Sequence, residues 1–186
     1  MWFTRAAALL TAVMALSPAH ADVVRVAAPL GYKVFCLSNP GECRPTAARG
    51  GVQASNGRVT LTAARALDLD TVNQAINARI APRQEQSGLD RWQPDAPAGD
   101  CEDYALAKQR ALIRMGWPSS ATLLSKVRTP RGVLHVVLLV RTDRGDFVLD
   151  NLSKSVEQVG AIAYRWESMQ SSDDPLRWQH ARGTGS

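Results

Sequence analysis

The sequence VLHVVLLVRTDRGDFVLD, residues 133–150, determines the fold class of this chain more than any other segment. Residues 133–141 form an almost unbroken run of aliphatic side chains, typical of a central strand buried on both faces. Residues 142–145, Thr-Asp-Arg-Gly, predict a hairpin turn, and residues 146–150 begin the returning strand. The segment therefore predicts an antiparallel strand pair in the middle of a sheet.

His135 is a polar side chain in the middle of this apolar strand, where a buried polar group needs a partner. If the turn is centred between Asp143 and Arg144, Asp150 faces Val137, which shares a face with His135. Asp150 is then a diagonal neighbour of His135, about 7–8 Å away between backbones and within side-chain reach. A one-residue bulge would place Asp150 on the opposite face. The register predicts a His–Asp pair, and the alternative is a hydrogen-bonded core histidine without a catalytic role.

The rest of the chain supplies helices before the sheet and further strands after them. Turn residues make the first part of the chain loop-rich, whereas apolar spacing and capping residues mark the helices. On the first helix, Asn73 and Asn77 could bond the backbone of a loop. Helices followed by an antiparallel sheet predict one α+β domain. The expected elements are a loop-rich segment at 22–54, a helix from Asp70 to Pro82, a helix from 99–104 to Gly116, a strand at 121–127, and a strand or helix at 156–169.

The first 21 residues have the layout of a secretory signal peptide. Arg5 supplies a positive charge, an apolar run covers residues 6–16, and residues 19–21 form an Ala-His-Ala cleavage site. This apolar run is too short to cross a bilayer core, which needs about twenty residues. We therefore expect residues 1–21 to be a signal peptide, and residues 22–186 to be a single exported domain, periplasmic and without a transmembrane segment.

Composition excludes several classes of function. The 186 residues are 45% hydrophobic and 21% charged, which is typical of a globular protein rather than a disordered one. The net charge of +5 comes from scattered Lys and Arg, with no basic block and no interleaved aromatic residues, so a nucleic-acid partner is not expected. No Gly-rich phosphate loop is present, which argues against nucleotide chemistry. We expect no organic cofactor.

Three cysteines remain after the signal peptide. Cys36 and Cys43 flank a turn-rich stretch with Asn-Pro-Gly at 39–41, and in an oxidising compartment they predict a local disulfide. Cys101 is then left alone, and an odd cysteine in a secreted protein is either an intermolecular link or a reactive thiol. A buried, inert Cys101 is the remaining interpretation.

Cys101 lies at the expected N-terminus of a helix, where free N–H groups and the helix dipole lower a thiol pKa and can hold an oxyanion. Asp100, Glu102 and Asp103 surround the thiol and act in the opposite direction, by raising its pKa. Acidic residues in a first turn often only complement the helix dipole. Three of them around one cysteine suggest in addition a neutralising partner: an imidazolium, a cation or hydrogen bonds.

Cys101, His135 and Asp150 together predict a nucleophilic triad. The imidazole takes the thiol proton, and the carboxylate fixes the tautomer and stabilises the imidazolium. Such a thiolate–imidazolium pair attacks the acyl carbon of amides, esters or thioesters. A zinc site is excluded by count, since one free Cys and one well-placed His do not supply four ligands. A serine hydrolase is also not expected, because no Gly-x-Ser-x-Gly occurs.

The chain resembles the bacterial transglutaminase-like cysteine peptidases over nearly all of residues 22–186. The central blocks that carry the resemblance surround the three triad residues, and shorter matches lie on either side. They are GDCEDYA at 99–105 with Lys108, Leu112 and Gly116; HVVL at 135–138; RTD at 141–143; GDFVLDN at 145–151; Asn73, Asn77, Gly88, Asp90 and Trp92; Phe35, Cys36 and Cys43; and Ser171, Pro175 and Trp178.

The resemblance implies a papain-like, transglutaminase-type fold with Cys101 as nucleophile, His135 as base and Asp150 as the residue that orients it. Its best-known members are periplasmic proteases that cleave large surface adhesins and so release cells from a biofilm. They depend on calcium, for which Asp100, Glu102 and Asp103 are the matching carboxylates here. They are also controlled by an inner-membrane receptor.

The resemblance therefore implies a protein substrate of the adhesin type, calcium as cofactor and a receptor as partner. Two alternatives stay open at this point. The same triad serves an acyltransferase or cross-linking enzyme that uses an amine instead of water. A non-catalytic periplasmic interaction module would need Cys101 only for structure.

Overall fold

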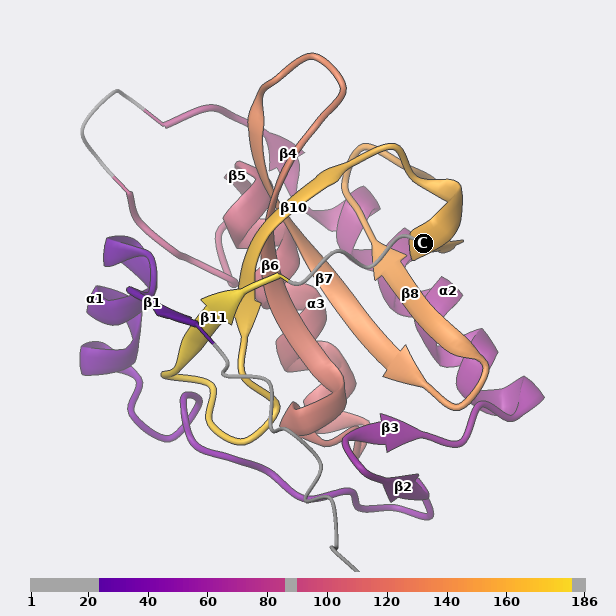
Figure 1. Cartoon of the computed structure of the whole chain (residues 1–186). Coiled ribbons are helices and arrows are strands. Elements are labelled where there is room, and N and C mark those ends of the chain that lie inside the picture. The colour runs from indigo at the N-terminus through magenta and orange to yellow at the C-terminus, as the bar shows by residue number, and fades with distance from the viewer. Residues whose placement is uncertain (1–23, 86–89, 182–186) are drawn as a thin grey trace, which may run out of the picture.

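In the computed structural model, which describes residues 24–85 and 90–181, a twisted sheet forms the centre of the protein (Figure 1). The hydrogen-bonded order is β1-β11-β10-β6-β7-β3-β2, with β8 beside β7 and β9 beside β8. The strands are β1 Arg25–Val26, β2 Ala54–Ser55, β3 Arg58–Val59, β6 Thr122–Arg128, β7 Leu134–Thr142, β8 Gly145–Leu149, β9 Glu157–Gln158, β10 Arg165–Gln170 and β11 Trp178–His180; β4 Ala81–Pro82 and β5 Ala98–Gly99 form a separate two-stranded pair.

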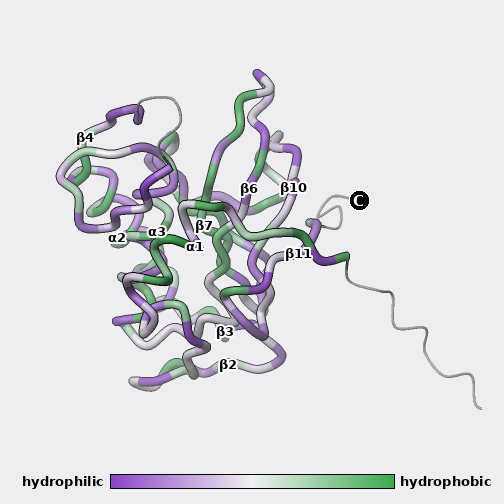
Figure 2. The backbone as a smooth tube through the Cα atoms, turned by 90° about the vertical axis from the view of Figure 1, so that its left-hand side faces the viewer, coloured by the Kyte–Doolittle hydropathy of each residue, from purple (hydrophilic) through white to green (hydrophobic). Residues whose placement is uncertain are grey.

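The three α-helices of the described residues lie on one side of this sheet (Figure 2). α3 packs directly against β6 and β7, and α2 packs against α3. The helices are α1 Leu30–Ser38, α2 Ala63–Arg79 and α3 Cys101–Arg114, with 3₁₀ turns η1 Ser119–Ala121 and η2 Val159–Ala161. The expected α+β class, with helices packed on an antiparallel sheet, is confirmed.

The hairpin of β7 and β8 has the predicted register. Leu138 faces Leu149 and Thr142 faces Gly145, so Asp143 and Arg144 form a two-residue turn without a bulge. Gly145 has φ +112°, a conformation that L side chains rarely adopt, so a glycine suits the end of this turn. The turn fixes the pairing along both strands, and it brings the end of β8 back beside the start of β7.

β7 is buried on both faces, as its aliphatic sequence predicts. Val136, Leu138 and Val140 belong to the large core that also contains residues of the three helices. Val137 and Leu139 point to the opposite face, into a smaller core with residues of β6, β8 and β10. Such two-sided burial makes β7 a rigid support for the residues at its ends.

Two expectations for secondary structure differ in detail from the structure. The segment 22–54 is not only loops, because it contains α1, which carries Cys36. α2 begins at Ala63 instead of Asp70, because the Thr62 side chain accepts the Arg65 N–H at 3.2 Å and so caps the helix about two turns earlier. Within the otherwise antiparallel sheet, the short strand β3 runs parallel to β7.

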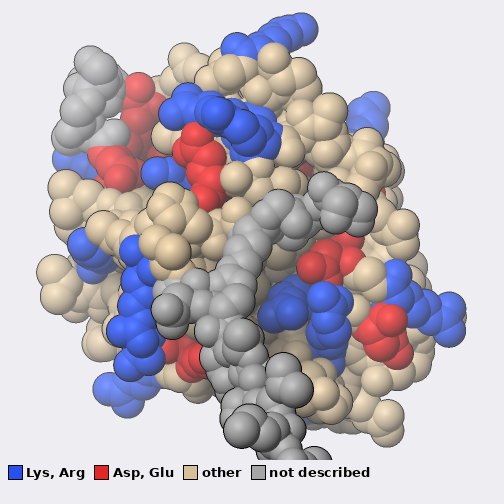
Figure 3. Space-filling model, viewed as in Figure 1, with Lys and Arg blue, Asp and Glu red and all other residues tan. Residues whose placement is uncertain are grey.

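Other expectations about the chain are confirmed or lie outside the described part. Cys36 and Cys43 form the predicted disulfide. The expected signal peptide at residues 1–21 lies outside the described residues. Within residues 24–85 and 90–181, no helix has both the length and the hydropathy needed to cross a membrane. On the face seen in Figure 3, acidic side chains lie among the basic ones instead of leaving one continuous basic patch.

Candidate active site

The start of α3 is fixed by Asp103, the third residue of the helix. Its Oδ2 accepts the Asp100 N–H at 3.2 Å and its Oδ1 accepts the Gln93 N–H at 2.6 Å. A Cβ at Gly99 would lie 2.0 Å from Asp103 Oδ2, so only glycine fits there. Burial raises the pKa of Asp103 to about 6. These contacts hold the first turn of α3, and with it Cys101, in one position.

The Cys101 thiol is half-buried and donates a hydrogen bond to Glu102 Oε2 at 3.0 Å. Burial raises the pKa of this thiol, and the negative charge and hydrogen bond of Glu102 raise it further, whereas a backbone hydrogen bond at Val136 acts in the opposite direction. Burial and nearby Asp100 also raise the pKa of Glu102 to about 7. The thiol is therefore protonated in this arrangement, as its acidic surroundings lead one to expect.

His135 and Asp150 form a buried pair. His135 Nε2 lies 2.8 Å from Asp150 Oδ1, and the two residues are only 5% and 3% exposed. Burial by itself would raise the pKa of Asp150, but the hydrogen bond and charge of His135, with a hydrogen bond from the Leu152 N–H, lower it overall. The carboxylate is thus ionised, and it fixes the tautomer with the proton on Nε2.

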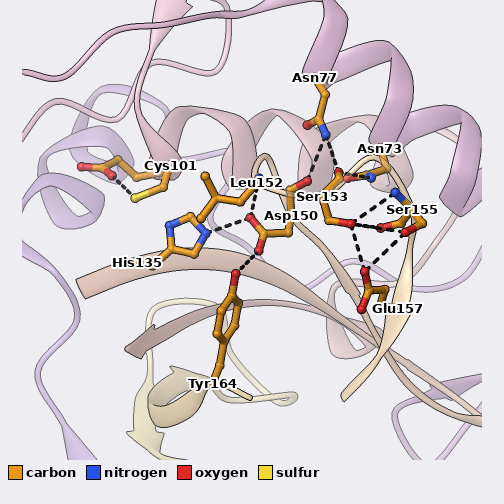
Figure 4. A network of polar contacts seen from close by, with 11 residues as sticks. Asn73, Asn77, Cys101, His135, Asp150, Leu152, Ser153, Ser155, Glu157 and Tyr164 are labelled. Carbon is orange, nitrogen blue, oxygen red and sulfur yellow. Dashed lines mark hydrogen bonds and ion pairs between the residues drawn. The ribbon is translucent and has the colours of Figure 1, made fainter. Parts of the chain in front are cut away.

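The arrangement places His135 between the thiol and the carboxylate. In Figure 4 the imidazole lies between Cys101 and Asp150, with its other ring nitrogen, Nδ1, on the side of the thiol. Cys101 and His135 line the same two hollows of the surface. The structure therefore brings together the three residues that the sequence singled out, from α3, from β7 and from the position directly after β8.

The loop that follows Asp150 is held by two amide side chains of α2. Asn77 Nδ2 donates to the carbonyl oxygens of Asp150 at 3.0 Å and Ser153 at 2.9 Å, and Asn73 Nδ2 donates to Ser153 O at 3.2 Å (Figure 4). Asn73 is fully buried, so its bond is shielded from water. These bonds confirm that the two asparagines bind loop backbone, and they fix where β8 ends.

Tyr164 is a residue of this site that the sequence did not indicate. It lies in the segment between η2 and β10, and its hydroxyl donates to Asp150 Oδ2 at 2.7 Å. Its ring stands edge-on to His135, with centroids 5.9 Å apart. No local pattern in the sequence marks it, because its contact with Asp150 is set by the packing of β10 and not by spacing.

Two hollows meet at the Cys101–His135 pair. The larger, of about 580 Å³, has Tyr164 and the exposed side chains of Val133 and Leu152 on its walls. The smaller, of about 450 Å³, is lined by carboxylates and Lys126. The thiol and the imidazole therefore lie in the wall that the two hollows share. The carboxylate residues of the smaller hollow are Glu85, Asp90, Asp100 and Glu102.

The three carboxylates expected to bind calcium differ in their surroundings. Asp100 and Glu102 face the smaller hollow, and Asp100 Oδ1 is buried without a hydrogen-bond partner among the described residues. Both oxygens of Asp103 accept backbone N–H groups. Over residues 24–85 and 90–181, no group of three His, Cys, Asp or Glu side chains is arranged to hold a metal ion. The free oxygen and the crowded charges of Asp100 and Glu102 fit part of a calcium shell.

Comparison with known proteins points to one family. The model of the bacterial transglutaminase-like cysteine proteinases, BTLCP, matches residues 23–185. No curated protein sequence matched the chain.

Solved structures of LapG from Legionella pneumophila have a similar fold. The calcium-bound form has a TM-score of 0.55 at 23% identity, covering 64% of this chain and 72% of that one. The EGTA-treated form has a TM-score of 0.51 at 22% identity, covering 57% and 63%. A third LapG structure has a TM-score of 0.55 at 21% identity, covering 63% and 70%. The likeness to these structures is one of fold.

Proposed function

Because this chain belongs to the bacterial transglutaminase-like cysteine proteinases, we propose that it hydrolyses peptide bonds with Cys101 as nucleophile, His135 as base and Asp150 as the orienting carboxylate. The observation that carries this assignment is the buried His135–Asp150 pair beside the free thiol of Cys101. A cysteine peptidase needs an imidazole held in one tautomer next to its thiol.

The reaction begins with transfer of the Cys101 proton to His135 Nδ1. The thiolate attacks the carbonyl carbon of the scissile peptide, and the negative charge that forms on the oxygen faces the N–H groups at the start of α3. The C–N bond breaks as the imidazolium gives its proton to the leaving amine. Water, deprotonated by His135, then hydrolyses the thioester, which releases the acid and restores the thiol.

Asp150 stays ionised through this cycle. Its Oδ1 accepts from His135 Nε2, so the imidazole cannot turn and Nδ1 stays free for the thiol proton. Because the carboxylate is buried, its attraction for the imidazolium is weakly screened by solvent. The pair therefore supports the charged form of His135 when the thiolate forms.

Calcium is proposed as the cofactor, with Asp100, Glu102 and Asp103 as its carboxylates. When bound, it would supply positive charge beside the nucleophile. Glu102 now accepts the thiol hydrogen, and Asp100 raises the pKa of Glu102, so a ligand that engages both carboxylates would free the thiol for His135. Asp103 would act mainly through the helix start, since both of its oxygens already accept N–H groups. LapG has been solved both calcium-bound and EGTA-treated.

The substrate, location and regulation follow from the family resemblance. We propose a periplasmic protease whose substrate is a large surface adhesin and whose activity is controlled by an inner-membrane receptor. The expected signal peptide and the disulfide of Cys36 with Cys43 support export to an oxidising compartment. The cleft, open over both hollows, supports an extended protein segment as substrate.

The test is to incubate the protein with exported proteins in ¹⁸O-labelled water, beside Cys101→Ala and with calcium or EGTA. Hydrolysis predicts new C-termini that carry ¹⁸O, formed by the wild type with calcium and not by the variant. Addition of a tagged primary amine separates the acyltransferase alternative, since transfer would place the amine on the new C-termini. No cleavage and no amine transfer under any condition would contradict the proposed function.

A further inference from the structure

Tyr164 contacts both the acid and the base of the proposed triad. Its hydroxyl donates to Asp150 Oδ2 at 2.7 Å, and its ring packs edge-on against the His135 ring at an interplanar angle of 78° (Figure 4). It also lines the larger hollow, in which a substrate would lie. None of the reaction steps described above uses it.

The two oxygens of Asp150 have different partners. Oδ1 accepts from His135 Nε2 and from the Leu152 N–H at 2.9 Å. Among the described residues, Oδ2 accepts only from Tyr164. A buried carboxylate oxygen that loses its donor cannot be resolvated without a change in geometry. The Tyr164 hydroxyl therefore holds the second oxygen of the carboxylate, while His135 and the Leu152 N–H hold the first.

The Tyr164 hydroxyl can donate this hydrogen bond at any pH near neutrality. Burial raises the pKa of Tyr164, and the charges of Asp150 and Glu157 raise it further, so its hydroxyl remains a donor at neutral and moderately alkaline pH. The ring also limits the space into which the imidazole of His135 could turn.

We propose that Tyr164 is a positioning residue that holds Asp150 and, through it, His135 in the orientation needed to accept the Cys101 proton. The catalytic consequence of this role rests on the proposed function, whereas the effect of Tyr164 on the orientation of Asp150 and His135 does not. It predicts that the hydroxyl matters more than the ring, since the ring only restricts His135 from one side.

The experiment compares Tyr164→Phe with Tyr32→Phe as a matched control. Tyr32 lies on α1, away from His135 and Asp150, and its buried hydroxyl accepts a hydrogen bond from Gln170 Nε2 at 2.8 Å. Both variants lose one hydrogen-bonded hydroxyl and keep an aromatic ring. A difference between them therefore reports the contact with Asp150, and not the general cost of losing a tyrosine hydroxyl and its hydrogen bond.

Two readouts are needed. The first is the NMR signal of the His135 Nε2 proton, assigned by its loss in His135→Gln. In Tyr164→Phe it should shift or broaden and exchange faster with solvent, whereas Tyr32→Phe should leave it unchanged. The second is turnover, for which we expect kcat to fall about tenfold in Tyr164→Phe with KM nearly unchanged, and the acid limb of the pH profile to move to higher pH.

The two readouts separate this proposal from the proposed function. If the wild type cleaves nothing, peptidase activity is refuted, and the NMR signal still decides whether Tyr164 positions His135. The positioning role is overturned if the His135 signal of Tyr164→Phe matches the wild type, or if Tyr32→Phe changes it as much. It is also overturned if an active wild type and Tyr164→Phe have the same kcat and pH profile.

Discussion

Replacing Asp150 with asparagine should abolish most catalysis and leave the fold intact. In the structure, Oδ1 of Asp150 accepts from His135 and from the Leu152 N–H, and Oδ2 accepts from the Tyr164 hydroxyl. An asparagine carbonyl can take the place of Oδ1. Its amide then faces Tyr164, whose hydroxyl can rotate to become the acceptor. The substitution thus preserves the shape of the site and removes its negative charge.

The size of the effect follows from that charge. Two unit charges about 4 Å apart attract by about 4 kcal/mol at an effective dielectric constant of about 20, which corresponds to roughly a thousandfold in an equilibrium constant. The imidazolium of His135 forms during proton transfer, so most of this attraction is gained on the way to the thiolate. Some water in the open cleft weakens it. We expect kcat to fall by about a hundred- to a thousandfold, with KM little changed.

Stability should change much less. The neutral asparagine keeps its hydrogen bonds, so the free energy of unfolding should fall by about 1–2 kcal/mol near neutral pH. The pKa of Asp150 is lowered in the folded protein, so its contribution is present above the ordinary aspartate pKa and is lost as the pH falls through the lowered value. The difference in stability between wild type and variant should therefore shrink at acid pH.

The assay is initial-rate cleavage of a substrate that the wild type digests, with urea unfolding measured in parallel. Asp146→Asn is the matched control, because Asp146 lies in β8, four residues before Asp150, and pairs with Arg58 at 2.6 Å, away from the site. Asp146→Asn should keep kcat within about threefold of the wild-type value. A folded Asp150→Asn with near wild-type kcat, or an Asp146→Asn that loses as much, would refute the role of the Asp150 charge.

Three further perturbations test other parts of the account. Glu102→Gln, measured in EGTA, should lower the pKa of the Cys101 thiol, because it removes the negative charge beside the sulfur. The pKa of Glu102 is raised to about 7 in the folded protein, so wild-type stability should decline as the pH rises from about 4.5 to 7, and the stability of the variant should decline less. Equal alkylation profiles and equal pH–stability curves would contradict this. Replacing Cys36 and Cys43 by serine should cost about 2–3 kcal/mol in urea unfolding, since the disulfide closes a short loop, and an unchanged midpoint would count against it. Asn77→Ala should remove the side-chain donor of the Asp150 carbonyl, leave Ser153 O with its bond from Asn73, and lower kcat several-fold. Faster amide exchange in the loop after β8 is the structural readout, and unaltered exchange would show that the loop is held by other contacts.

The parts of the fold that the sequence predicted are those set by short-range rules. The β7–β8 register followed from a two-residue turn and a period of two, so Asp150 could be placed beside His135. The start of α3 followed from the residues around Cys101, and the disulfide from two cysteines that flank a turn. Each of these depends on residues that lie close together in the chain.

What the sequence did not predict depends on distant packing or on competing local signals. α1 is only nine residues long and contains Gly31, so its pattern was read as loop. The start of α2 was placed at Asp70 because an acidic residue resembles a cap, although Thr62 and the alanines after it extend the helix. Tyr164 reaches Asp150 only because β10 pairs with β6 across the sheet. No spacing in the sequence reports that contact.

The most direct test of the central claim is the pH dependence of iodoacetamide alkylation at Cys101, in wild type and His135→Ala, with calcium and with EGTA. The account predicts that calcium-loaded wild type reacts well below pH 8, and that His135→Ala reacts only as the ordinary thiol ionises. In EGTA the wild type should be alkylated more slowly, because the thiol keeps its proton and donates it in a hydrogen bond to Glu102. A slow, ordinary thiol in both proteins under both conditions would mean that no ion pair forms, and would contradict the assignment of Cys101 and His135.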